Sequence, residues 1–118
     1  MGLNLADTNY PQRGDVYWVK LDPTVGTEIK KTRPGVIVSN NVQNMSSRRV
    51  IVAPVTSNVD KVYSFEARIT VDGRPAKALL DQIRAIDRVR LGERICSLNP
   101  KEMKAVSAAM RIALEINS

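Results

Sequence analysis

Residues 27–34, TEIKKTRP, gather charge immediately before an apolar run, GVIVS. The charged side chains are Glu28, Lys30, Lys31 and Arg33. Pro34 restricts the backbone of Arg33 to extended conformations. A guanidinium group held in this way can bind a phosphate through two parallel hydrogen bonds, and nearby lysines add diffuse attraction. The segment therefore has two interpretations, an anion-binding site or a solvated charged loop.

Further polar residues occur at the ends of other apolar runs. Thr56 and Ser57 end RVIVAPVTS, where hydroxyl groups either cap turns or bind phosphate oxygens. Asp81 and Gln82 interrupt an apolar stretch, and a buried polar pair needs partners, so this pair is expected to tie loops together or to face a site. A second basic segment is either surface charge or a track for a nucleic-acid backbone. Its arginines are Arg84, Arg88, Arg90 and Arg94.

The composition excludes several kinds of chemistry. The 118 residues include no histidine, which excludes a Ser-His-Asp triad, a Cys-His pair and a His-ligated metal. We expect no metal site and no cofactor. The net charge of +6 favours a polyanion or an acidic protein as partner. The single Cys96 cannot form an internal disulfide, and no signal peptide or membrane-spanning segment is recognisable, so we expect a soluble cytoplasmic protein.

The elements that would position these residues are mostly short strands. We expect a flexible arm at residues 1–12 and one domain at residues 13–118. Strands are predicted within residues 14–23, 35–39, 49–57, 63–71 and 76–87, with a turn at Asp72-Gly73. Asn99, Pro100 and Glu102 form the start signal of a helix. Its apolar stripe comprises Met103, Val106, Met110, Ala113 and Leu114. The sequence predicts a small β-barrel with a terminal helix.

Five motifs occur in order from Arg13 onward: RGDVYWVKLDPTVGTE, KTRPGVIVS, APVTS, DQIRAID and RLGE, followed by the helix. This combination resembles the MazF/PemK family of toxin endoribonucleases. The resemblance implies a mainly β fold, an SH3-like (CcdB/PemK-type) barrel with a C-terminal helix, assembled as a homodimer. It also implies metal-independent, sequence-specific cleavage of single-stranded RNA and neutralisation by an acidic antitoxin.

The same resemblance implies roles for individual residues. Arg33 matches the family's catalytic arginine, Thr56 its catalytic threonine, and Glu28 an acidic position that is either the general base or a support for Arg33. Six residues are expected to contact RNA: Lys30, Lys31, Ser57, Asp81, Gln82 and Arg84. Thr27 and Leu79 occupy positions where PemK-type relatives use histidine and arginine, so the Arg-Thr arrangement of the MazF type is the better comparison.

Two alternative functions fit the same barrel. A CcdB-like toxin binds DNA gyrase without nuclease activity, and a barrel adaptor only binds nucleic acid. The intact Arg33 and Thr56 motifs favour the nuclease over the CcdB-like toxin, and incubation with a long RNA would separate the nuclease from the adaptor.

Overall fold

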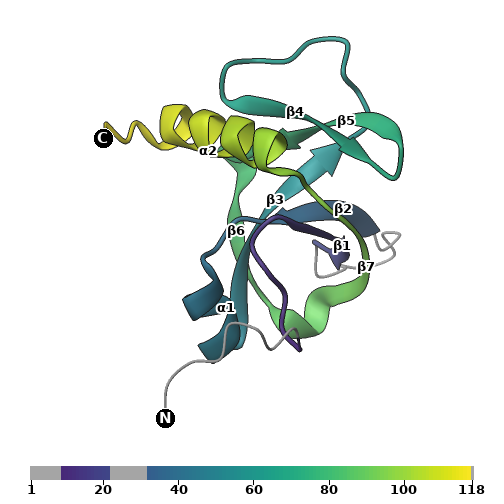
Figure 1. Cartoon of the computed structure of the whole chain (residues 1–118), viewed down its shortest axis with the longest axis vertical. Helices are drawn as coiled ribbons and strands as arrows, with labels where there is room; N and C mark the ends of the chain where they lie inside the picture. Colours follow the sequence, from purple (N-terminus) through teal and green to yellow (C-terminus); the bar gives the residue numbers. More distant parts are fainter. Residues whose placement is uncertain (1–8, 22–31, 118) are drawn as a thin grey trace, which may run out of the picture.

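The computed structural model describes residues 9–21 and 32–117. This part of the chain contains seven strands: β1 (Asp15–Lys20), β2 (Thr32–Ile37), β3 (Arg49–Thr56), β4 (Glu66–Val71), β5 (Arg74–Leu79), β6 (Arg84–Asp87) and β7 (Leu91–Ser97). Its helices are α1 (Asn41–Ser46) and α2 (Pro100–Leu114), and the short 3-10 turns are η1 (Leu80–Gln82) and η2 (Arg88–Arg90). Figure 1 shows α2 lying beside β4, with α1 at the opposite end of the molecule.

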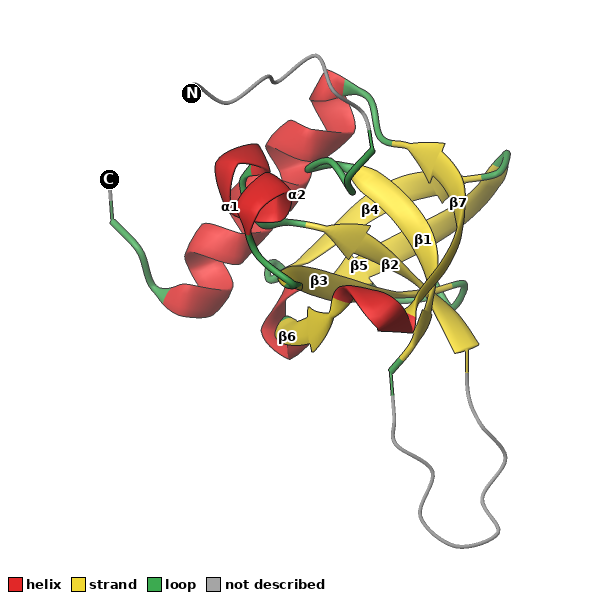
Figure 2. Cartoon of the chain, turned by 90° about the horizontal axis from the view of Figure 1, so that it is seen from below, coloured by secondary structure: helices red, strands yellow, loops and turns green. Residues whose placement is uncertain are grey.

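The strands form one curled antiparallel sheet in the order β4-β5-β3-β2-β1-β7, with β6 beside the first half of β3. Figure 2 shows the sheet curving around on itself as a half-barrel. One core cluster joins small and β-branched side chains of the sheet, such as Val16 and Ala53, to Val106 of α2. A second cluster includes Val19 and Val52. The prediction of a mainly β, barrel-like fold with a C-terminal helix is confirmed.

Pro54 lies where β3 changes partners. Residues 49–52 of β3 pair with β6, and Val55 and Thr56 pair with β5. On this side of β3, Pro54 falls between the two pairings, where a proline is tolerated because the ladder does not need its missing N–H. On the other side it lies opposite Gly35 of β2, and β3 continues past it to end at Thr56.

The start of α2 follows the sequence prediction. Asn99 is the N-cap, its side chain accepts from the Glu102 N–H, and the Glu102 side chain accepts from the Asn99 N–H. Val106 is fully buried on the predicted apolar face. The prediction that Leu114 belongs to this apolar stripe is wrong, because its side chain is 49 % exposed. The last turn of α2 projects beyond the sheet (Figure 1).

The strand predictions need three corrections. Residues 76–87 form two strands rather than one, because η1 turns the chain between β5 and β6. Residues 63–65 form a turn before β4, closed by a hydrogen bond from the Glu66 N–H to the Tyr63 carbonyl, so they do not share the alternation of β4. Strand β7 was not predicted, and it pairs with β1 to extend the sheet.

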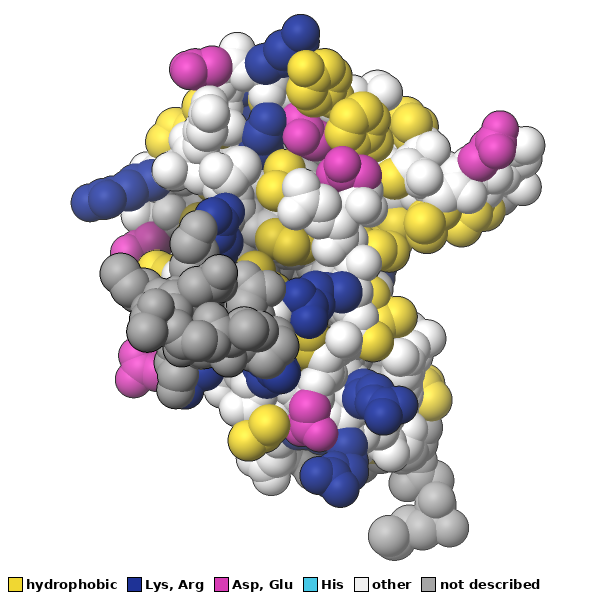
Figure 3. All heavy atoms as spheres, turned by 180° about the vertical axis from the view of Figure 1, so that it is seen from behind, with side chains coloured by type: hydrophobic (Ala, Val, Ile, Leu, Met, Phe, Trp, Pro, Cys, Tyr) yellow, Lys and Arg dark blue, Asp and Glu magenta, His cyan; other side chains and the backbone are white. Residues whose placement is uncertain are grey.

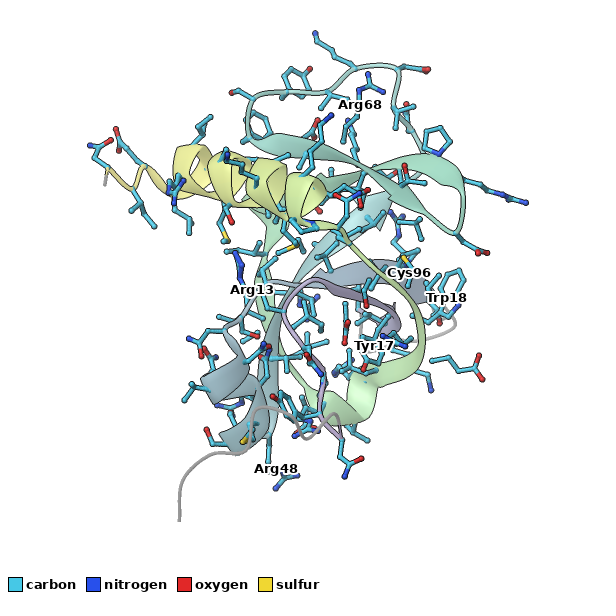
Figure 4. The ribbon with its side chains drawn as sticks, in the orientation of Figure 1. Arg13, Tyr17, Trp18, Arg48, Arg68 and Cys96 are labelled. Carbon is cyan, nitrogen blue, oxygen red and sulfur yellow. The ribbon has the colours of Figure 1, made fainter. Side chains whose placement is uncertain are left out.

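The predicted N-terminal arm is described only from residue 9. Within this part, Tyr10 is 6 % exposed, and the Gln12 N–H donates to the Asp15 carboxylate. Arg13 then donates from its guanidinium group to the Val38 carbonyl and to Ser107 Oγ (Figure 4). Residues 9–12 therefore pack against the barrel. In the described ranges, no helix is long and apolar enough to cross a membrane.

Candidate active site

A cavity of about 620 Å³ lies between the strand ends of the half-barrel and the β4–β5 hairpin. It is called the Arg33–Thr56 cavity below. Its lining residues are Trp18, Arg33, Pro34, Val55, Thr56, Ser57, Val71, Asp72, Arg74, Pro75, Ala76 and Ile95. The structure thus brings Arg33 of the KTRP motif together with Thr56 and Ser57 of the APVTS motif, three residues that the sequence marked as candidates.

Arg33 belongs to β2 itself rather than to the loop before it. It lies opposite Val19 of β1, and the next residue, Pro34, lies opposite Trp18. Val19 is fully buried, so Arg33 pairs with a strand that is anchored in the core, while its own side chain is exposed. Among the described residues, no ion pair or hydrogen bond occupies its guanidinium group. A cation on a firm strand with its donors available is suited to binding an anion.

Thr56 is the last residue of β3 and is partly buried. Its Oγ1 accepts a hydrogen bond from the Asn58 N–H at 3.2 Å. Because the oxygen acts as acceptor in this contact, the hydroxyl hydrogen is left to donate to another group. Thr56 can therefore present one hydrogen-bond donor to an anion in the cavity that Arg33 also lines.

Three lining residues with charged or aromatic side chains, Trp18, Asp72 and Arg74, were not predicted as site residues. Trp18 is 43 % exposed and shows its ring at the edge of the barrel (Figure 4), although it occurs within a regular strand pattern. Asp72 and Arg74 enter the cavity from the β4–β5 turn. Asp72 and Gly73 both have positive φ, as in a type I′ turn, so the turn prediction is confirmed. Because the sequence pattern explained Asp72 as a turn residue, Asp72 was not considered as a site residue.

Other predicted residues are not at this cavity. Asp81, Gln82 and Arg84 are exposed and do not line it. The expectation that Asp81 and Gln82 form a buried pair is wrong, because η1 turns both side chains to the surface. Glu28, Lys30 and Lys31 lie outside the described residues.

Several arginines of the second basic segment support the fold. Arg88 donates to the carbonyls of Asn44 and Asn9, and Arg90 donates to the carbonyl of Lys20. Arg94 lies 3.8 Å from the buried Asp15 carboxylate. Figure 3 shows Lys and Arg side chains gathered in the lower half of one face, with some acidic groups among them. The donors of Arg88 and Arg90 thus join separate backbone segments of the barrel.

A buried ion pair lies near the end of β3. Lys77 Nζ is 2.9 Å from Glu66 Oε1, and the two side chains are only 11 % and 8 % exposed. Burial raises the pKa of the Glu66 carboxyl, but hydrogen bonds from Lys77 and the Tyr63 N–H, with the Lys77 charge, outweigh it and hold the pKa below its usual value. Glu66 is on the same face of β4 as the exposed Arg68 and Thr70, yet its own side chain is buried.

The described residues contain no group of three or more Cys, Asp or Glu side chains close enough to share a metal ion. The described site offers instead two arginines, two hydroxyl groups, one carboxylate and one exposed tryptophan around a single cavity. Together with the curled sheet and terminal helix, these groups give a small barrel protein with a candidate site whose chemistry suits an anionic ligand that also stacks on an aromatic ring.

Comparison with known proteins identifies the family. The family model described as "PemK-like, MazF-like toxin of type II toxin-antitoxin system" matches residues 12–114, and the chain belongs to this family. It is 34 % identical over 111 residues to "Endoribonuclease EndoA" of Bacillus subtilis, covering 89 % of this chain and 95 % of that protein. It is 36 % identical over 113 residues to "Endoribonuclease MazF" of Staphylococcus saprophyticus, covering 91 % and 93 %.

Solved structures agree on the fold. MazF from Deinococcus radiodurans superposes with a TM-score of 0.75 at 25 % identity, covering 91 % of this chain and 98 % of that one. A mycobacterial endoribonuclease in complex with its cognate antitoxin gives 0.77 at 23 % identity, covering 92 % and 98 %.

Proposed function

We propose that this protein is the toxin of a type II toxin-antitoxin system and a metal-independent, sequence-specific endoribonuclease that cleaves single-stranded RNA. The observation that carries the proposal is the meeting of Arg33, Thr56 and Ser57 in one cavity. The curated relatives named endoribonuclease support the reaction class.

The proposed reaction is an intramolecular transesterification, in which the phosphoryl group passes from O5′ to O2′ of the RNA. The ribose 2′-hydroxyl attacks the adjacent phosphorus, its proton passes to a base, the P–O5′ bond breaks, and the departing O5′ takes up a proton. The products are a 2′,3′-cyclic phosphate and a 5′-hydroxyl end. Negative charge builds up on the phosphate oxygens during attack, and a preorganised cation stabilises that charge more than it stabilises bound substrate.

Each cavity group has a part in this reaction. Arg33 stabilises the charged transition state, since an arginine side chain is a poor acid at neutral pH. The Thr56 hydroxyl donates to a phosphate oxygen, and Ser57 lies beside it. Two carboxylates are candidates for the base: Glu28, from the resemblance, and Asp72, which lines the cavity.

Other lining residues suit the rest of the RNA chain. The exposed Trp18 ring offers a stacking surface for a base, and Arg74 offers a second contact to a phosphate. Asp81, Gln82 and Arg84 are exposed outside the cavity, and the proposal keeps them as contacts to flanking nucleotides. Lys30 and Lys31 remain part of the proposal as contacts to the RNA backbone.

The proposed partners follow from charge and exposed apolar area. An acidic antitoxin would compete with RNA for the positively charged surface, in keeping with the net charge of +6 and with the antitoxin complex of the mycobacterial relative. The exposed apolar side chains of Ile112, Leu114 and Ile116 near the end of α2 support a homodimer. We place the protein in the cytoplasm, where messenger RNA and a reducing environment for Cys96 coincide.

The test is incubation of the purified protein with a long RNA of known sequence, with and without excess EDTA, followed by mapping of the ends. The proposal expects discrete cuts that survive EDTA and fail when the 2′-hydroxyl at the cut is replaced by hydrogen. Loss of cutting on chelation, restored by Mg²⁺, would contradict the mechanism. Binding without cuts would indicate an adaptor, and inhibition of DNA gyrase alone a CcdB-like toxin.

A further inference from the structure

The segment from residue 57 to residue 65 joins β3 to β4 and arches above the β4–β5 hairpin (Figure 1). It begins at Ser57, beside the cavity, so its path affects the groups there. Below it lies Lys77 of β5, directly opposite Thr56 in the strand register. The lysine was not a candidate in the sequence, because it sits within an otherwise apolar run.

The Lys77 ammonium group holds this segment at two points. Its Nζ donates to the Lys61 carbonyl at 2.6 Å and to Glu66 Oε1 at 2.9 Å. Glu66 Oε1 also accepts from the Tyr63 N–H at 2.9 Å. One cation therefore fixes the middle and the end of the segment onto β5, in surroundings that exclude most water and strengthen these bonds.

The beginning of the same segment holds Thr56. The Asn58 N–H donates to Thr56 Oγ1, and the Asp60 N–H donates to Asn58 Oδ1, both at 3.2 Å. The Asn58 N–H thus occupies one acceptor position of the threonine oxygen and limits the directions in which the hydroxyl hydrogen can point. Asp60 is adjacent to Lys61, so the carbonyl that Lys77 anchors lies three residues along the chain from Asn58.

We propose that Lys77 is a positioning residue for Thr56: by anchoring the Lys61 carbonyl and Glu66, it fixes the segment that orients the threonine hydroxyl toward the phosphate. Lys77 touches neither RNA nor the reacting atoms in this account. The proposal rests on the proposed endoribonuclease function and adds to it a residue outside the cavity lining.

The experiment measures single-turnover RNA cleavage at saturating protein, together with RNA affinity and a thermal melt. The test variant is Glu66→Gln/Lys77→Met, which removes the anchor without leaving an unpaired buried charge and keeps an oxygen acceptor for the Tyr63 N–H. The single variant Lys77→Met is measured beside it, so that one failure to fold does not end the test. Lys104→Met, on the exposed side of α2, is the control for loss of one positive charge.

Each change is also made in a Thr56→Val background. In the wild-type background we expect the double variant to cleave roughly tenfold more slowly, a part of the 10²- to 10³-fold that loss of one transition-state donor typically costs. RNA affinity should change less than twofold beyond the Lys104→Met control. In the Thr56→Val background the further loss should be under about twofold, because residues acting through one another are not additive.

Equal slowing in both backgrounds would overturn the proposal, since Lys77 would then act independently of Thr56. An unchanged rate in the folded wild-type background would also overturn it, while leaving the proposed function intact. Absence of RNA cleavage by the wild-type protein itself would instead refute the proposed function.

Discussion

Replacing Lys77 with methionine should destabilise the protein, because the Glu66 carboxylate would remain buried without its cation. Both side chains are about nine-tenths buried, and their charged atoms are 2.9 Å apart. Removing one partner of such a pair typically costs about 3–5 kcal/mol. Glu66 keeps the Tyr63 N–H and can take up a proton, so we expect the lower end, about 3 kcal/mol. For a chain of this length that corresponds to a melting temperature lower by roughly 10 °C.

The stabilities of the wild type and of Lys77→Met should change with pH in opposite directions. In the wild type, the lowered pKa of Glu66 means that the pair contributes stability above the ordinary glutamate pKa and loses it as pH falls through the lowered value. In the Lys77→Met variant, burial is the largest remaining influence on Glu66, and we expect it to raise the pKa of the Glu66 carboxyl in the folded protein above its value in the unfolded chain. Folding then favours the protonated form, so Lys77→Met should lose stability as pH rises through the unfolded glutamate pKa toward the raised folded one.

The assay is a series of thermal melts from acidic to neutral pH for wild type, Lys77→Met, Glu66→Gln/Lys77→Met and the control Lys104→Met. The deficit of Lys77→Met should shrink on acidification, and the double variant should recover part of the stability with no such pH dependence. A deficit that stays constant with pH, or that the double variant also shows in full, would refute a buried ion pair at this position.

Two further predictions concern the strands and the substrate. Gly35→Ala would place a Cβ 3.0 Å from Val19 Cγ2 in the core, and should lower stability by about 1–3 kcal/mol in a thermal melt. Gly73→Asn, at a positive φ with open space, should change it little, and equal melts for the two would contradict the packing argument. Arg74→Ala should lower the slope of log RNA affinity against log salt by about 0.7, one phosphate contact, whereas Arg111→Ala on α2 should not; an unchanged slope for Arg74→Ala would exclude that contact.

Local signals in the sequence predicted the parts of the fold that local chemistry decides. The Asn99–Glu102 capping box and the Asp72-Gly73 turn need only neighbouring residues, and both occur as predicted. Strand β7 escaped prediction because LGERICS has charged residues at its centre and little burial, and its hydrogen bonds come from β1, which is distant in sequence. The six-residue helix α1 is short and polar, with its Asn40 cap as the main signal.

In the candidate site, too, local motifs predicted single residues but not how they come together. Arg33 and Thr56 could be named from their motifs, but their meeting depends on the pairing of β2 with β3, which no local pattern specifies. Arg74 reaches the cavity because the β4–β5 hairpin folds over the end of β3. Lys77 resembled an interruption of an apolar strand until its partners, Lys61 and Glu66, were seen around it.

The most direct test of the central claim is single-turnover cleavage of a short RNA by Arg33→Ala, read beside RNA affinity and a thermal melt. The exposed Arg48, which forms an ion pair with Asp87 and lies at the lower end of the molecule away from Trp18 (Figure 4), provides the control variant Arg48→Ala. The account predicts that Arg33→Ala folds normally, binds RNA nearly as well as Arg48→Ala does, and cleaves on the order of 10²- to 10³-fold more slowly. Arg33→Lys should also be largely inactive, because an ammonium group cannot make the planar two-point contact. A normal cleavage rate in a well-folded Arg33→Ala protein would contradict the assignment of this cavity as the active site.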